Sequence, residues 1–157
     1  MVGDDRTLSA LQAAVKALPT APDRAAQVFR LVTSDDPGVA DAWLGRVATG
    51  DHALSTLRAL ATNAARIGHD LRAVQVRPGD LGARFHTDYI QLTIHDADTA
   101  TLAYIAALID ARQYQDAHDR LSTLGASPAA AYIRAVLYSR TQRWPDVLGA
   151  VSGCAGW

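Results

Sequence analysis

The side chains best suited to metal chemistry gather within one short stretch of this sequence. Nitrogen and oxygen atoms that commonly bind metal ions are supplied there by His86, Asp88, His95, Asp96 and Asp98. No pair of histidines spaced four residues apart supports a site, and no cysteine lies nearby to complete one. Polar strand ends and a helix cap account for the same residues, so we expect no metal site.

The sequence shows no arrangement typical of an enzyme. Serine, histidine and aspartate are all present, but no G-x-S-x-G motif positions a serine nucleophile. Cys154 has no neighbouring histidine to activate it, and we expect it to pack as a small apolar residue. Lys16, the only lysine, lies in AAVKALP, which lacks the glycines and the Ser or Thr of a phosphate-binding loop. We therefore expect no catalytic residue and no bound cofactor in this chain.

Composition narrows the class of protein further. The chain has 157 residues, a hydrophobic fraction of 49% and a formal net charge of −1, with its arginines scattered among its acids. This pattern favours one globular domain and argues against a nucleic-acid partner, which requires a basic patch. No apolar run is long enough for a membrane span. The acidic N-terminus and the single cysteine favour a cytoplasmic location.

Apolar residues recur mostly at helical spacing. This periodicity predicts helices over 7–18, 22–32, 37–49, 52–67, 99–111, 115–124, 128–141 and 145–151. We expect Pro37 to open the third helix, Asp51 to cap the fourth, and Asp98 or Thr99 to cap the fifth. The fifth helix is apolar nearly all round, which predicts a central position. The short connections predict antiparallel neighbours.

Two segments between the fourth and fifth helices alternate in polarity instead. VQVR (Val74–Arg77) and YIQLTIH (Tyr89–His95) predict a two-stranded β finger near residues 74–95. A helical turn over Asp80–Phe85 would separate the strands. Ala83–His86 is the alternative for the pairing strand, and the sequence leaves the register open.

The helices contain an internal repeat. The segment beginning at Tyr104 aligns with the segment beginning at Tyr132, and Tyr114 then matches Trp144 beyond the turn. In the first half, successive intervals of four, three, five and six residues separate Ala25, Phe29, Val32, Pro37 and Trp43. This spacing is typical of tetratricopeptide repeats and predicts an all-α solenoid of helical hairpins. We expect repeat packing to involve Ala25, Phe29, Pro37, Trp43, Tyr114, Ala117 and Trp144.

Four segments together resemble a known family. DAWLGRVATGD (41–51), LGARFHTDYIQLTI (81–94), LAYIAALI, and RWPDVL followed by GCAGW are similar to the N-terminal domain of EccA, the AAA+ ATPase of actinobacterial type VII (ESX) secretion systems. The resemblance covers about residues 7–157. It implies tetratricopeptide-like repeats around a β finger, which engage secretion substrates or their chaperones and regulate a C-terminal ATPase domain that uses ATP and Mg²⁺.

This chain departs from that family in lacking Walker motifs, so no catalytic residue is carried over. The apolar ending WPDVLGAV leads us to expect a longer array, followed by an AAA+ domain, truncated after Trp157. The resemblance implies protein partners, namely secreted ESX-type or PE/PPE-type substrates or their chaperones. We expect a monomer or weak dimer. A generic tetratricopeptide-like adaptor and a small enzyme are the alternative functions.

A strip of cations near the end of the chain is the predicted partner-binding surface. Guanidinium groups pair well with carboxylates, so this strip would suit an acidic peptide terminus. A solvated helix face explains the same residues. The strip consists of Arg134, Arg140 and Arg143, and Tyr138 in the same stretch is the fourth predicted partner-binding residue.

Overall fold

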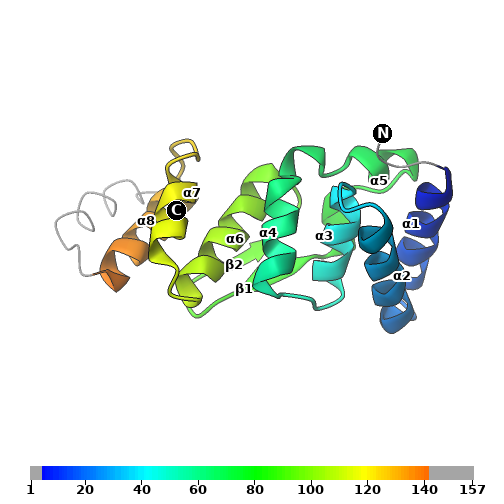
Figure 1. The fold of residues 1–157 in the computed structure, drawn as a ribbon, viewed down its shortest axis with the longest axis horizontal. Coiled ribbons are helices and arrows are strands. Elements are labelled where there is room, and N and C mark those ends of the chain that lie inside the picture. The colour runs from blue at the N-terminus through cyan, green and yellow to red at the C-terminus, as the bar shows by residue number, and fades with distance from the viewer. Residues whose placement is uncertain (1–4, 142–157) are drawn as a thin grey trace.

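The computed structural model describes residues 5–141, which form a row of helices with a small β hairpin beside it (Figure 1). The helices follow one another along the long axis, from α1 and α2 at one end to α8 at the other, except α5, which lies back beside α1 and α3. The helices are α1 (Asp5–Ala17), α2 (Pro22–Asp35), α3 (Ala40–Ala48), α4 (Leu54–Thr62), α5 (His69–Ala73), α6 (Ala97–Asp110), α7 (Tyr114–Leu121) and α8 (Pro128–Arg140). None of these helices is long and apolar enough to cross a membrane.

The predicted all-α solenoid is confirmed. Consecutive helices pack as antiparallel pairs, with α1 against α2, α3 against α4, and α6 against α7. The predicted fourth helix ends at Thr62, and a 3₁₀ turn, η1 (Ala64–Arg66), follows it. The short helix α5 was not predicted. The predicted helix at 145–151 lies outside the described residues.

The start of α3 differs from the prediction. Pro37 was expected to open this helix, which begins instead at Ala40. The N–H of Gly38 donates to the Asp36 carboxylate at 3.2 Å, closing an Asx turn that holds the chain in a loop for three more residues. The indole N–H of Trp43 donates to the Pro37 carbonyl at 2.8 Å and fastens this loop to α3.

Two cap predictions were also wrong. The cap of α4 is Ala53, and Asp51 lies two residues earlier, where its carboxylate accepts a hydrogen bond from the Ala53 N–H at 3.2 Å. The cap of α6 is Asp96, whose carboxylate accepts from the Thr99 N–H at 2.8 Å. The Thr99 hydroxyl in turn receives a hydrogen bond from the Asp96 N–H, completing a capping box.

The hairpin confirms the alternative pairing. Strand β1 (Arg84–His86) runs antiparallel to β2 (Gln91–Thr93), with Phe85 opposite Leu92. The prediction of a strand at 74–77 was wrong, because Gln75 adopts a left-handed φ of 59°. The Val76 N–H then donates back to the Leu71 carbonyl at 3.0 Å, closing a turn after α5. The helical turn falls earlier than expected, as the 3₁₀ helix η2 (Pro78–Leu81).

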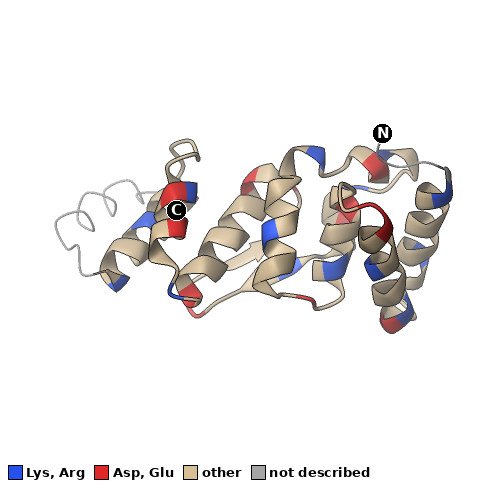
Figure 2. Ribbon diagram, in the orientation of Figure 1, with Lys and Arg blue, Asp and Glu red and all other residues tan. Residues whose placement is uncertain are grey.

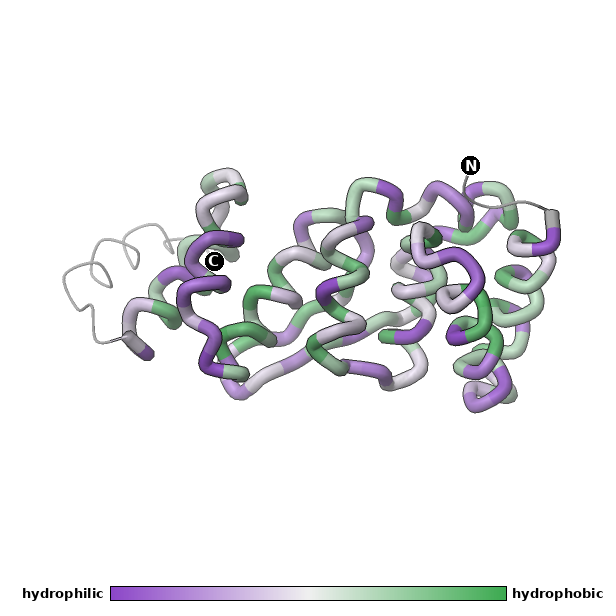
Figure 3. The backbone as a smooth tube through the Cα atoms, viewed as in Figure 1, coloured by the Kyte–Doolittle hydropathy of each residue, from purple (hydrophilic) through white to green (hydrophobic). Residues whose placement is uncertain are grey.

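The central position predicted for α6 is confirmed. This helix packs against α4, α7 and α8, and also against η1 and β2. Figure 3 shows the backbone tube of α6 coloured mostly as hydrophobic residues. Eight of its side chains are buried: Ala100, Leu102, Ala103, Tyr104, Ile105, Ala106, Leu108 and Ile109.

The hairpin lies along the row of helices. Strand β1 contacts α3 and β2 contacts α6, and these are the first helices of successive pairs. The Tyr89 hydroxyl donates to the Ala106 carbonyl of α6 at 3.0 Å. The Tyr132 hydroxyl of α8 donates to the Tyr89 carbonyl, so the hairpin turn is held between two helices. The segment between α4 and α6, which we call the insertion, therefore covers part of the surface formed by α3 and α6.

Candidate functional site

Asp41, at the start of α3, organises the insertion from within the core. Its side chain is fully buried and accepts hydrogen bonds from the N–H groups of Gly68 at 2.6 Å, Asp70 at 2.9 Å and Leu71 at 2.9 Å. These amides form the N-terminus of α5, where N–H groups lack helical partners. Burial raises the pKa of Asp41, against the opposing effect of these hydrogen bonds. Asp41 thus fixes α5 onto α3.

Asp70 is a second buried carboxyl beside the first. It is 3% exposed, and its Oδ2 has no hydrogen-bond partner in the described part of the chain. Burial first, and then the charge of Asp41, raise the pKa of Asp70. Two carboxyls near one helix start therefore both favour the protonated form more than an exposed aspartate does.

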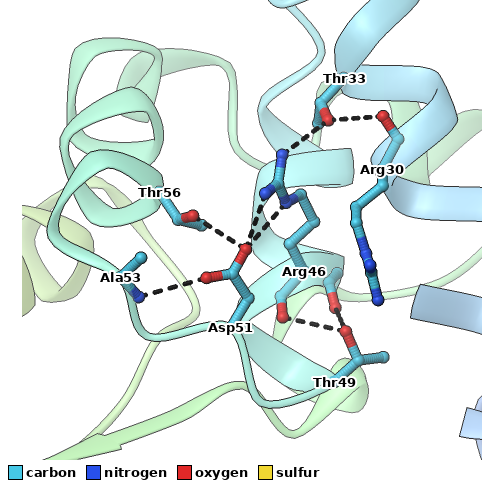
Figure 4. Close-up of polar contacts among 8 residues, drawn as sticks. Arg30, Thr33, Arg46, Thr49, Asp51, Ala53 and Thr56 are labelled. Atoms are coloured by element: carbon cyan, nitrogen blue, oxygen red, sulfur yellow. Dashed lines mark hydrogen bonds and ion pairs between the residues drawn. The ribbon is translucent and has the colours of Figure 1, made fainter. Parts of the chain in front are cut away.

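Arg46 and Asp51 connect three helices (Figure 4). Arg46 Nε and Nη2 both donate to Asp51 Oδ2, at 3.0 and 2.8 Å. Arg46 Nη1 donates to the Thr33 hydroxyl of α2 at 3.1 Å, and the Thr56 hydroxyl of α4 donates to Asp51 at 2.9 Å. The guanidinium also lies 4.8 Å from the ring centre of Trp43. The network joins α2, α3 and α4.

The protonation of Asp51 follows from this network. Burial alone would raise its pKa, but the hydrogen bonds from Ala53, Arg46 and Thr56, with the charge of Arg46, hold the pKa below the usual range. Asp51 is therefore ionised at neutral pH and forms an ion pair with Arg46. Asp41, Arg46 and Asp51 of segment 41–51 thus hold helices together.

The predicted packing residues occupy varied positions. Ala25 and Phe29 of α2 are fully buried, and the Phe29 ring lies against Gly45 of α3. Trp43 is half-buried, as is Tyr114. Pro37 is exposed, Ala117 is buried, and Trp144 lies outside the described residues.

Two of the predicted partner-binding residues of α8 face different neighbours, Tyr138 facing α7 and Arg140 facing the hairpin. The Tyr138 ring lies 6.4 Å from the His118 ring of α7, and Tyr138 lines a hollow of about 210 Å³ between these helices. The Arg140 guanidinium lies 5.5 Å from the ring centre of Tyr89. Arg134 is half-buried, and Arg143 lies outside the described residues. A partner-binding role for these four residues stays a prediction.

The five candidate metal ligands lie in two places. His86 and Asp88 belong to the hairpin, whereas His95, Asp96 and Asp98 lie just before or at the start of α6. Only His95 and Asp96 approach one another, with 3.4 Å between Nδ1 and Oδ2, and both are exposed. No group of three or more His, Cys, Asp or Glu residues within 5–141 is arranged to hold a metal ion. Figure 2 shows acidic and basic residues interspersed along the ribbon.

The hairpin presents a polar surface that the sequence did not single out. The exposed side chains of its strands line a hollow of about 410 Å³ together with Phe85 and Leu92. Asp41 and the pair of Arg46 and Asp51 were missed as well. The signal for Asp41 was a carboxylate among apolar residues in the first turn of a helix, although its partners lie far along the chain.

Comparison with known proteins agrees with this architecture. Residues 4–157 match the family described as "T7SS, ESX-1 secretion system protein EccA1, N-terminal domain". The ESX-5 secretion system protein EccA5 of Mycobacterium marinum is 33% identical over 144 residues, covering 87% of this chain and 23% of that protein. The ESX-1 secretion system protein EccA1 of Mycobacterium tuberculosis is 29% identical over 160 residues, covering 98% of this chain and 28% of that protein.

A solved structure shows the same fold. The crystal structure of the N-terminal domain of the EccA1 ATPase from the ESX-1 secretion system of Mycobacterium tuberculosis superposes with a TM-score of 0.89 at 28% identity. The match covers 98% of this chain and 58% of that one. This chain spans about a quarter of the length of the curated relatives it matches. The family match and the shared fold show that this protein belongs to the EccA family of type VII secretion system proteins, to the part described as the N-terminal domain.

Proposed function

We propose that this chain is a protein-interaction module of a type VII secretion ATPase. It engages secreted substrates or their chaperones in the cytoplasm and regulates the ATPase to which it belongs. The observation that carries this proposal is the fold match to the N-terminal domain of the EccA1 ATPase, with a TM-score of 0.89. Helical solenoids suit such a role because a stack of hairpins presents an extended surface to a partner polypeptide.

The chemistry of the chain supports a role in binding. The side chains of Asp41, Arg46 and Asp51 are hydrogen-bonded to other residues of this chain, which suits a scaffold. The residues present do not fit ATP, because the sequence has one lysine, Lys16, and no phosphate-binding loop around it. We therefore assign nucleotide hydrolysis to another part of the parent protein and derive no catalytic step here.

A binding experiment tests the proposal. The purified chain is titrated by calorimetry with secreted helical-hairpin proteins that are encoded in the same secretion locus as the chain. The chaperones encoded in that locus are titrated in the same way. An unrelated helical hairpin of equal size and charge is the control. Saturable binding to a secreted protein or a chaperone, with none to the control, would support the proposal. Equal binding to all, or binding to none, would contradict substrate engagement and favour a generic adaptor.

Regulation needs a separate measurement. The ATPase domain of the same locus is assayed with and without the chain added in trans. We expect the rate of ATP hydrolysis to change when the chain is present, because a regulatory domain must bias the conformation of the motor. An unchanged rate of ATP hydrolysis at a saturating concentration of the chain would contradict the regulatory part of the proposal.

A further inference from the structure

The hairpin has one face packed inward and one face open to solvent. Side chains alternate along a strand, so Phe85 points one way while Arg84 and His86 point the other. Phe85 is 6% exposed, and its cross-strand partner Leu92 is half-buried. Arg84 and His86 are exposed, as are the residues opposite them. The register therefore builds one polar face, consisting of Arg84, His86, Gln91 and Thr93, which we call the donor face.

Every side chain of the donor face can donate a hydrogen bond. Arg84 offers a guanidinium, His86 an imidazole N–H, Gln91 an amide and Thr93 a hydroxyl. Arg84 pairs across the hairpin with Thr93, and His86 with Gln91, so the four donors stand at the corners of one small patch. All four line the hollow of about 410 Å³, a volume that admits a side chain from a partner.

These donors are unused within the described part of the chain. No hydrogen bond or ion pair joins the side chain of Arg84, His86, Gln91 or Thr93 to another residue of 5–141. Arg46 makes a useful contrast, because its guanidinium is hydrogen-bonded to both Asp51 and Thr33. A free guanidinium beside further donors is complementary to a carboxylate, which accepts several hydrogen bonds at once.

The patch is also held in place. Tyr89 is bonded to α6 through its hydroxyl and to Tyr132 of α8 through its carbonyl, which fixes the hairpin turn. Phe85 packs beneath the strands, where the His52 ring meets it edge-on with 5.8 Å between ring centres. A ligand would therefore meet donors on a supported backbone, and binding would cost less ordering than on a free loop.

We propose that the donor face is a docking site for a protein segment that carries an aspartate or glutamate, with the carboxylate seated on Arg84. The proposal rests on the proposed function and adds to it the chemistry of the partner and the place where it binds. The single positive charge of Arg84 is balanced by the single negative charge of one carboxylate. A nucleic-acid backbone requires several cations in a row, and the donor face carries Arg84 as its only arginine.

The proposal can be tested without knowing the partner. The full chain, labelled with ¹⁵N, is titrated with the capped peptide acetyl-Ser-Asp-Ser-Asp-Ser-amide, and amide shifts are recorded. The same peptide with Asn at both Asp positions is the ligand control. Arg84→Gln and Thr93→Val test the site, because the first removes the charge but keeps a polar side chain and the second removes the hydroxyl but keeps the shape of the side chain. Arg24→Gln, on the exposed side of α2, is the matched protein control.

We expect the acidic peptide to shift the amides of 84–86 and 91–93, and the Asn peptide to leave them unmoved. Arg84→Gln should weaken binding by about tenfold and Thr93→Val by about threefold, while Arg24→Gln changes nothing. Shifts centred elsewhere, or none at millimolar peptide, would overturn the proposal. Tighter binding of an oligothymidylate than of the acidic peptide would overturn it as well.

The two proposals fail in different ways. If a secreted protein or a chaperone binds wild-type chain and Arg84→Gln equally, the docking site is wrong while the proposed function stands. If the peptide binds at the donor face but no protein of the secretion locus binds the chain, the proposed function is wrong while the donor face remains a carboxylate-binding site. Circular dichroism of Arg84→Gln at matched concentration confirms that the variant is folded.

Discussion

Arg46 donates two hydrogen bonds to a single carboxylate oxygen of Asp51, from Nε at 3.0 Å and from Nη2 at 2.8 Å. The two residues lie at the end of α3 and in the loop before α4, and both are largely shielded, with side-chain exposures of 22% and 29%. Thr33 and Thr56 extend the pair to α2 and α4. The ion pair thus links α2, in one helical hairpin, to α3 and α4, in the next.

Replacing Arg46 with lysine should destabilise the chain. Lysine keeps the charge but loses the planar fork, so it cannot serve Asp51 and Thr33 together. We expect a loss of about 1 kcal/mol in the free energy of unfolding, measured by urea denaturation. Arg24 is exposed, so Arg24→Lys is the control and should change the free energy of unfolding by less than about 0.5 kcal/mol. Equal stability of both variants would show that the fork contributes nothing.

Gly45→Ala tests the packing between α2 and α3. A Cβ at Gly45 would overlap the buried ring of Phe29, so the ring or the helix backbone must shift. We expect a loss of about 2 kcal/mol in thermal or urea unfolding, despite the helix propensity of alanine. Combining it with Phe29→Leu should recover part of the loss, because the smaller side chain makes room. Gly125→Ala, where a Cβ meets nothing within 4 Å, is the control.

The helices could be predicted because their apolar period is local. Alternating residues at 74–77 suggested a strand, but the left-handed φ of Gln75 and the return bond from Val76 to Leu71 end α5 there instead. Periodicity carries no information about such a turn. The true strand at 84–86 has one buried residue, Phe85, between two polar ones, which is too short a pattern to decide the pairing alone.

The polar contacts that position the insertion could not be predicted, because they join distant segments. Asp41 caps a helix that begins nearly thirty residues later, and Tyr132 reaches back to Tyr89 in the hairpin. Sequence spacing reveals partners within a helical turn or across a tight hairpin, and none of these pairs has such spacing. The donor face was likewise hidden until the register placed Arg84 opposite Thr93.

Asp41 and Asp70 should make stability depend on pH. Both carboxyls have a pKa raised above 3.8, so the folded chain holds more protons than the unfolded chain in the window above that value. Their stabilising contribution is present below the window and is lost as pH rises through the folded pKa values. Asp70→Asn removes one titration, so the free energy of unfolding, variant minus wild type, should rise as the pH increases above 3.8 and passes through the raised pKa of Asp70. Asp88→Asn, at an exposed loop residue, is the control, and a flat difference for Asp70→Asn would contradict the prediction.

Tyr89→Phe should loosen the hairpin without unfolding the solenoid. The variant loses the hydrogen bond to Ala106, so we expect amide exchange in the hairpin, at Thr87 and Ile94, to accelerate about fivefold. Tyr114→Phe, in α7, is the matched control and should leave these amides unchanged. Uniform acceleration through α6 would instead indicate global destabilisation.

The same substitution has a signature at alkaline pH. Burial first, and then the charge of Asp110, raise the pKa of Tyr89 from 10.0 to about 12, so the folded chain keeps this phenol proton where the unfolded chain has lost it. Its stabilising contribution is present below the unfolded pKa and is lost as pH rises through that range. The stability of wild type should therefore fall more steeply than that of Tyr89→Phe over this interval, measured by urea unfolding. Parallel slopes would show that Tyr89 is as accessible to water in the folded chain as in the unfolded one, and that the hairpin turn is not held against α6.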